Sequence, residues 1–291
     1  DRPNGPGGAV MVLLAIAIFI IGPLLVGLSM GLDRRITARL QNRRGPPLLQ
    51  PFYDIAKLFS KRPLVLGDLQ GMFAVFCLAF QAAAFGLFAL GGDLVVAFFI
   101  SSMGAVFLVL GAYSTPSPYS HLGANRELLA LLAYEPVLFL VIIAVGVNGS
   151  FLAGEVSRDL LGRIPLALLA LVPVLVILLE KSPYDIPAAH QELATGPYVE
   201  YSGPYLAVLE LGRWYQLAFV YGIATLFVWG DSAITDVAFK LILPFALLFA
   251  AIVIDNITAR LTRRRMVSFM LTAGVGLIAV NLVVSYLTGV I

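Results

Sequence analysis

Charged residues, cysteines and histidines are scarce in this chain. Only 12% of its 291 residues are charged, 60% are hydrophobic, and the mean hydropathy is +0.94. A water-soluble globular domain does not carry so much apolar surface, so that class is excluded. The single cysteine, Cys77, cannot form an intrachain disulfide or hold an iron–sulfur cluster by itself. His121 and His190 lie far apart and outside any metal-binding motif, so we expect neither a metal site nor a redox centre in this chain.

Long hydrophobic runs dominate the sequence. A membrane-spanning helix needs roughly 20 apolar residues, and eight stretches meet or approach that length. They cover residues 10–32, 70–90, 94–114, 128–147, 160–180, 206–229, 237–257 and 266–288. The first is too long for a signal peptide and lacks a small-residue cleavage site. The sequence therefore predicts an all-α polytopic membrane protein, a single domain over residues 1–291 with about eight transmembrane helices.

Basic residues gather on alternate loops. The loops after the first, third, fifth and seventh stretches hold 14 Lys and Arg residues, and the opposite side holds three. Positive charge stays on the cytoplasmic side of a membrane. We therefore expect cytoplasmic long loops and both termini outside, in a prokaryotic cytoplasmic membrane. The net charge of +2 reflects this asymmetry, and no nucleic-acid-binding motif is present, so no nucleic-acid partner is expected.

The first inner loop, residues 33–69, is the longest. After a Gly-Pro-Pro break, apolar residues recur at three- and four-residue steps with charged residues between them, which predicts an amphipathic helix. The apolar positions are Leu48, Leu49, Phe52, Ile55 and Phe59. Such a helix could lie on the membrane surface or be covered by a partner subunit, and the pattern leaves both possibilities open.

Glu135 precedes Pro136 inside the predicted helix 128–147. Proline has no amide proton, so the carbonyl of Leu132 loses its helical partner, and a kink of this kind can hold water. A charged carboxylate at mid-membrane costs roughly 2.5–3.5 kcal/mol on insertion scales. Glu135 could therefore exchange protons as a relay group, or it could stay protonated and serve as a hydrogen bond between helices.

More acids surround the loop 181–205, which joins two very hydrophobic stretches. Its prolines, glycines and tyrosines favour a folded, re-entrant segment lining a cavity over a flexible solvated loop. Glu210 and Arg213 share a helix face at i and i+3 and could pair with each other. Lys240 and Asp255 lie near helix ends, where both could reach the interface.

Three motifs together resemble one known family. They are the inner loop from Arg34 to Lys57, which contains ARLQNRRGPPLLQPFYDIAK, the stretch GANRELLALLAYEP from Gly123 to Pro136, and SPYDIPAAHQELATGPYVEYSG from Ser182 to Gly203. The chain is similar to the membrane coupling subunit of respiratory complex I and of the group 4 membrane-bound nickel–iron hydrogenases. In those complexes this subunit joins a peripheral redox arm to an ion-pumping arm.

Two departures from the complex I pattern favour the hydrogenase branch. The segment Arg43–Pro46 runs almost directly into Leu48–Pro51, where complex I proteins carry several extra residues. Complex I proteins also typically have Glu at the positions of Ala188 and His190. Quinone-linked and sulfur-reducing complexes share this type of subunit, and they remain alternatives.

The resemblance implies a non-catalytic subunit without a cofactor of its own. Its partners would be peripheral subunits with iron–sulfur clusters and a nickel–iron (NiFe) centre on the cytoplasmic side, and antiporter-like membrane subunits. Docking of the peripheral arm is assigned to Arg43, Arg44, Gln50, Asp54 and Lys57. Translocation of H⁺ or Na⁺ is assigned to Glu127, Glu135, Glu180, Asp185, His190, Glu192, Glu200, Glu210 and Arg213. A passive membrane anchor and a secondary transporter are the competing hypotheses, and the chain shows no internal repeat of the kind common in transporters.

Overall fold

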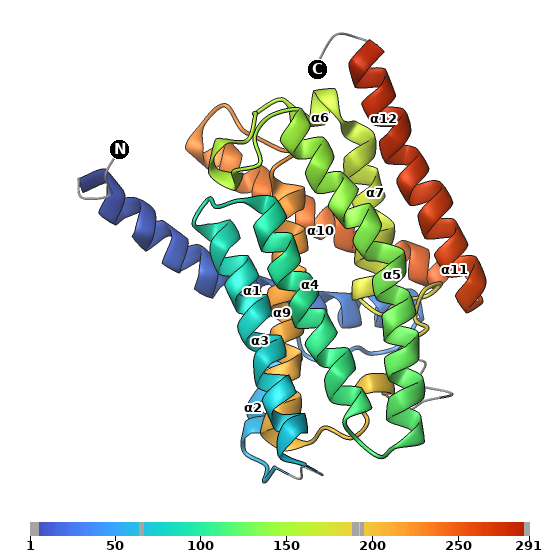
Figure 1. Ribbon diagram of the computed structural model, residues 1–291. Helices are drawn as coiled ribbons and strands as arrows, with labels where there is room; N and C mark the ends of the chain where they lie inside the picture. Colours follow the sequence, from blue (N-terminus) through green and yellow to red (C-terminus); the bar gives the residue numbers. More distant parts are fainter. Residues whose placement is uncertain (1–5, 64–66, 188–191, 193–194, 288–291) are drawn as a thin grey trace.

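The computed structural model describes residues 6–63, 67–187, 192 and 195–287, and these residues form helices and no strand (Figure 1). The long elements are α1 (Pro6–Leu40), α2 (Gln50–Phe59), α3 (Asp68–Ala89), α4 (Leu94–Tyr113), α5 (Pro118–Val147), α7 (Pro165–Leu178), α9 (Gly203–Thr225), α10 (Ala233–Ile257) and α12 (Val275–Leu287). The short helices α6 (Leu160–Arg163) and α11 (Arg263–Phe269) precede α7 and α12. A π-helical segment, Met270–Gly274, joins α11 to α12.

Each predicted hydrophobic stretch falls on a helix. Among the described residues, six helices are long and apolar enough to cross a membrane, and Pro165–Leu178 is a shorter apolar helix. The prediction of an all-α polytopic membrane fold is thus confirmed. Two boundaries were clearly wrong: the first helix runs on to Leu40 rather than ending at 32, and the fourth begins at Pro118 rather than 128. Residues 126 and 127 therefore lie inside α5, and Glu135 lies near its middle.

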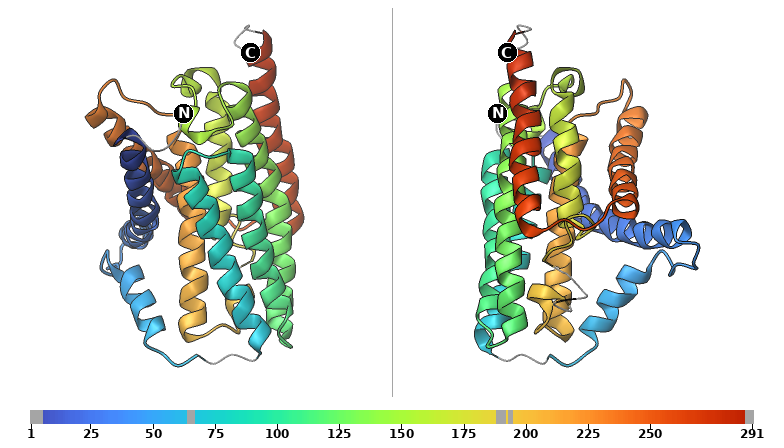
Figure 2. Two further views of the ribbon diagram at one scale, coloured as in Figure 1. Left: turned by 60° about the vertical axis from the view of Figure 1, so that its left-hand side comes forward. Right: turned by 90° about the vertical axis from the view of Figure 1, so that its right-hand side faces the viewer.

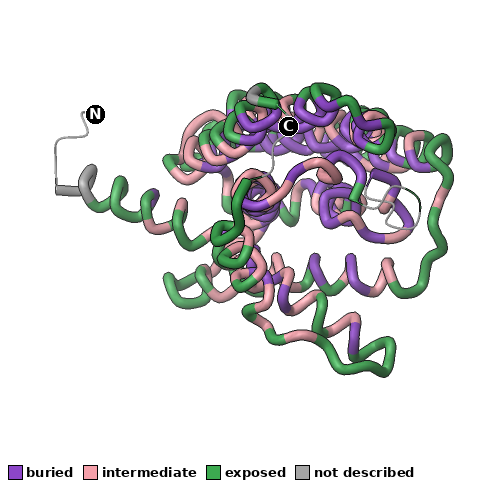
Figure 3. Tube along the Cα trace, turned by 90° about the horizontal axis from the view of Figure 1, so that it is seen from below, coloured by how far each residue is buried: buried purple, intermediate pink, exposed green. Residues whose placement is uncertain are grey.

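Helices α3, α4, α5, α7, α9 and α12 form an upright bundle, whereas α1 is strongly tilted and runs outward from it (Figures 1 and 2). The first half of α1 is largely exposed, as the view from below also shows (Figure 3). The connections 90–93 and 148–164 lie at the upper end in Figure 1, and residues 60–63 and the turn 114–117 lie at the lower end. Loops predicted to be on the same side of the membrane thus lie at the same end.

The helix in the first inner loop, α2, packs against this same chain. Phe52 contacts Trp214 of α9 edge to face, with ring centroids 5.2 Å apart, and Ile55 packs against the main core. Leu49 and Phe59 stay exposed. The chain's own helices therefore cover part of the apolar face of α2, at Phe52 and Ile55.

Gly123 of α5 allows the loop around residues 196–198 to approach the helix. A Cβ atom at Gly123 would lie 2.4 Å from the carbonyl carbon of Gly196 and 2.5 Å from the nitrogen of Pro197. Both are backbone atoms, so they cannot swing aside as a side chain would. The glycine thereby fixes where this loop meets the bundle.

We expect Gly123→Ala to destabilise the protein by about 1–3 kcal/mol, because the added methyl group overpacks a rigid contact. Gly276→Ala is the matched control, since a Cβ atom there meets nothing within 4 Å. That change should be neutral or stabilising by up to about 1 kcal/mol. Denaturation of both variants in the same detergent measures the difference, and equal midpoints would contradict the backbone contact.

Candidate functional site

A buried ion pair joins α9 to the end of α7. Nη1 of Arg213 lies 3.2 Å from a carboxylate oxygen of Glu180, and Nη2 donates to the carbonyl of Leu178 at 3.2 Å. The two charged side chains are only 15% and 18% exposed. Glu180 has a positive φ of 54°, so α7 ends at a left-handed residue that turns towards α9. Arg213 therefore pairs with Glu180 across helices rather than with Glu210 on its own helix.

The ion pair forms part of the wall of a central cavity between α3, α5, α7 and α9. This cavity of about 30 Å³ is also lined by Glu127, Tyr134 and Gln216. A polar space of that size holds about two water molecules. Glu127 thus faces the bundle interior instead of the membrane interface.

On one side, Glu180 and Arg213 also line a larger crevice of about 280 Å³ between α1, α2 and α9. This crevice contains Asp33, Asp54 and Glu210 in addition. Four carboxylates and two arginine side chains, those of Arg34 and Arg213, border it. Such a crevice is hydrophilic, although it lies among transmembrane helices.

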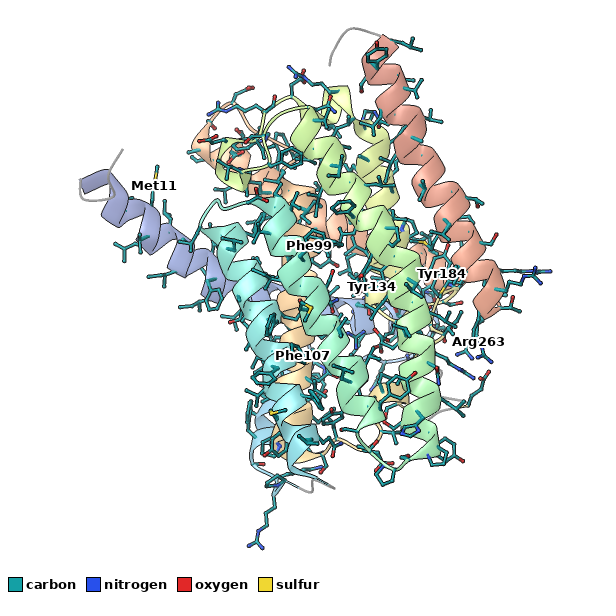
Figure 4. The ribbon with its side chains drawn as sticks, viewed as in Figure 1. Met11, Phe99, Phe107, Tyr134, Tyr184 and Arg263 are labelled. Carbon is teal, nitrogen blue, oxygen red and sulfur yellow. The ribbon has the colours of Figure 1, made fainter. Side chains whose placement is uncertain are left out.

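On the other side, Tyr134 and Gln216 separate the central cavity from a small cavity of about 10 Å³ beside Glu135 and Ser102. The amide of Gln216 donates a hydrogen bond to the Tyr134 hydroxyl at 3.0 Å. Figure 4 shows Tyr134 near the middle of the bundle, by α5. Three spaces therefore follow one another, and each shares lining side chains with the next.

We call the acids that line these spaces the carboxylate line. Its members are Asp54, Asp33, Glu210, Glu180, Glu127 and Glu135. The structure brings together four of the acids predicted for the ion pathway, namely Glu127, Glu135, Glu180 and Glu210. Asp33 was not predicted to belong to it, although its position near the end of the first hydrophobic stretch, on the same side as Glu180, was a usable signal.

The remaining predicted acids lie elsewhere. Asp185 accepts two hydrogen bonds from Arg260, and Glu192 binds Arg126 at 2.5 Å. Neither acid lines the three spaces, although Pro187 and Tyr198 of the same loop line the central cavity. Glu200 is half-buried outside these spaces. His190 lies outside the described residues.

Contacts between arginines and acids of the loop 181–205 shift two pKa values, those of Glu192 and Arg260. Arg126 donates a hydrogen bond to Glu192 and adds positive charge, which lowers the pKa of Glu192 below its ordinary value of 4.5. The hydrogen bond to Asp185 raises the pKa of Arg260. Both contacts tie the loop to α5 and to the segment before α11.

A second buried charge cluster was missed in the sequence. Lys181 is buried, and its Nζ atom lies 2.7 Å from Asp33 and 3.1 Å from Asp255. The amide of Ser182 also donates to Asp255 at 3.0 Å. Asp255 and Lys240 were both expected to reach the interface. Asp255 instead binds the start of the loop and fixes it to α10. Lys240 pairs with Asp236 at 2.8 Å.

The residues predicted to dock a peripheral arm fall into two groups. Arg43 and Arg44 are exposed and border a cleft of about 490 Å³ with Arg35 and Arg39, and Lys57 is also exposed. Gln50 and Asp54 instead bind within the chain: Asp54 accepts from Gln50 at 2.8 Å and from Arg34 at 3.0 Å.

Comparison with known proteins places the chain in a family. Residues 11–286 match the model of the family described as NADH dehydrogenase. The chain belongs to this family. Hydrogenase-4 component C of Escherichia coli is 31% identical over 69% of this chain and 70% of its own length, and formate hydrogenlyase subunit 4 of that bacterium is 32% identical over 68% and 70%. NADH-ubiquinone oxidoreductase chain 1 of Arabidopsis thaliana is 31% identical over 72% and 73%.

A solved structure agrees with this placement. A chain in the structure of the membrane-bound sulfane sulfur reductase, an archaeal respiratory membrane complex, is 25% identical, with a TM-score of 0.81 over 94% of this chain and 99% of its own. The predicted resemblance to the complex I and hydrogenase superfamily is confirmed, and the family member described here is a multi-pass membrane protein. The hydrogenase and NADH-ubiquinone oxidoreductase relatives have similar identities, so the choice of branch depends on the loop sequences.

We expect acidification to release the loop 181–205 from α5. Because the pKa of Glu192 is lowered in the folded state, its ion pair is complete above pH 4.5 and is lost as the pH falls through the lowered pKa. Glu192→Gln should therefore raise hydrogen exchange of loop peptides at about pH 6 and flatten the rise seen on acidification. Glu200→Gln is the control. The assignment fails if the wild-type loop exchanges at the same protection level on both sides of the transition.

Proposed function

We propose that this chain is the non-catalytic membrane subunit that anchors a hydrogenase-type electron-transfer arm and couples its redox chemistry to translocation of H⁺ or Na⁺. The carboxylate line carries the proposal. Acids placed along neighbouring cavities in an apolar bundle are typical of ion pathways. Each charged group there costs free energy, so ionisable residues are rare in membrane helices and mark functional positions.

The Glu180–Arg213 pair suits the role of a switch along this line. Arg213 borders both the crevice that contains Glu210 and the central cavity that contains Glu127. Arg213 can turn from Glu180 towards Glu210 or Glu127, and this would move its positive charge along the line. An added charge at one end of the line thereby changes the proton affinity of the next acid.

The exit towards Glu135 requires a rearrangement of a hydrogen bond. Tyr134 and Gln216 stand between the central cavity and the small cavity beside Glu135. The Tyr134 hydroxyl can accept from Gln216 while it donates its own proton. Rotation of that hydroxyl would pass a proton between the central cavity, which has room for water, and the side where Glu135 lies.

The loop 181–205 connects the docking of a peripheral arm to the proposed ion pathway. Its residues form part of the central cavity, and its surface acids bind Arg126 and Arg260. A peripheral arm seated on the cytoplasmic side could move this loop and alter the cavity. Iron–sulfur and nickel–iron centres would belong to that arm, and antiporter-like membrane subunits would receive the translocated charge.

Two other functions compete with this proposal. A quinone-linked or sulfur-reducing complex would use the same subunit type, but a quinone ring and its tail require a mostly apolar site. The crevice beside α2 is bordered by four carboxylates and two arginines instead, so a quinone would not bind in that crevice. A passive anchor would explain the family and the loops, but it would not need acids along connected cavities.

We expect Glu135→Gln to separate the two activities. In the purified complex, hydrogen formation in detergent should stay near the wild-type rate, while formation of an ion gradient in sealed vesicles should fall at least about tenfold, because the amide cannot exchange a proton. Glu155→Gln, in the exposed connection between α5 and α7, is the control. A gradient that survives Glu135→Gln would favour the passive anchor.

The exposed arginines should hold the peripheral arm. We expect the double variant Arg43→Glu/Arg44→Glu to reduce the share of peripheral subunits that copurify with the membrane part, because it reverses the charge of the cleft. The difference between wild type and variant should shrink as the salt concentration rises, because salt screens exposed charges. Charge reversal at the exposed Glu155, on a connection at the opposite end of the bundle, is the control. Equal recovery of the arm in all three preparations would remove the docking assignment.

A further inference from the structure

A second, apolar cavity lies apart from the carboxylate line. It has a volume of about 380 Å³ and lies between α1, α3, α9 and α10. Leu25, Phe85, Phe88, Leu241 and Phe245 form much of its wall. Its size falls within the range of small-ligand sites, and apolar walls of this kind disfavour a filling of water.

One end of this cavity is cationic. Lys240 lines it, and Nζ of Lys240 lies 3.8 Å from the ring centroid of Trp229. The guanidinium of Arg158 lies 5.5 Å from the same centroid. Asp236 binds Lys240 at 2.8 Å and takes one of its three donors. Two cationic groups thus flank an aromatic ring of the kind that gathers at membrane interfaces.

The surfaces beside the cavity are suited to hydrocarbon. Ile21 and Leu24 of α1 are exposed, and Ile242 of α10 is exposed next to Leu241. Helices α1 and α10 belong to the membrane-spanning set, so these side chains lie at membrane depth. A hydrocarbon chain can therefore reach the cavity from the bilayer without crossing a polar surface.

We propose that this cavity binds one phospholipid, with a hydrocarbon chain between α1, α3, α9 and α10 and the phosphate held by Lys240 and Arg158 beside Trp229. The apolar walls match the chain, and the two cations match the phosphate. The cavity shares no lining residue with the three spaces of the carboxylate line.

Native mass spectrometry of the full chain in mild detergent tests this site, with phosphatidylglycerol and the matching diacylglycerol as probes. The wild type should retain one phosphatidylglycerol and release the diacylglycerol. The double variant Leu25→Trp/Leu241→Trp narrows the cavity from two walls and should lose the retained phospholipid. Leu24→Trp/Ile242→Trp places the same rings on the neighbouring exposed positions and should retain it.

A separate variant, Lys240→Gln, tests whether the cationic end of the cavity holds the phosphate of the lipid. Lys240→Gln should weaken retention of phosphatidylglycerol at least about tenfold, because a charge-assisted hydrogen bond is lost. The proposal is overturned if both double variants retain lipid equally, if phosphatidylglycerol and diacylglycerol bind the wild type alike, or if Lys240→Gln changes nothing. Unfolding midpoints of the four preparations identify a variant that has lost its fold. Should the cavity-narrowing variant have done so, the Lys240→Gln result decides.

Discussion

The free-energy cost of burying charged side chains in an apolar helix bundle determines how the charged residues of this structure are paired. Arg213 and Glu180 offset part of that cost, because each provides the opposite charge beside the other. The carbonyl of Leu178 accepts a further hydrogen bond from the guanidinium. The pair also stands where two polar spaces meet. Both side chains line the two spaces, so the proposed coupling between them would run through this pair.

Lys181 supports this arrangement from the next residue along the chain. By binding Asp33 and Asp255 it joins the start of the loop 181–205 to α1 and α10. Arg126 and Arg260 fix the middle of the loop, and the contact of Gly123 with the backbone around Gly196 fixes its far part. A segment with many prolines and glycines thereby becomes a wall of the central cavity, a position from which a partner on the loop could influence the acids behind it.

The division of polar and apolar space follows the tilt of α1. Near its C-terminal end, where Asp33 and Arg34 lie, α1 forms the polar crevice with α2 and α9. Nearer its start, Leu25 forms the apolar cavity with α3 and α10. One tilted helix therefore borders both the hydrophilic space used in the proposed coupling and the hydrocarbon space that fits a lipid.

The sequence alone determined the membrane class, the positions of the hydrophobic helices and the family, because long apolar runs and contiguous motifs are local properties of the chain. The sequence also identified Glu135 as a candidate relay group, because a carboxylate directly before a proline inside a predicted helix is recognisable without a structure. Only the tertiary structure decided that Arg213 chooses Glu180 over Glu210, that Asp185 and Glu192 bind surface arginines, and that Lys181 links two distant aspartates. Those pairings join residues as far as 148 positions apart, between Asp33 and Lys181, and no periodicity along one helix specifies which charges meet when the helices pack.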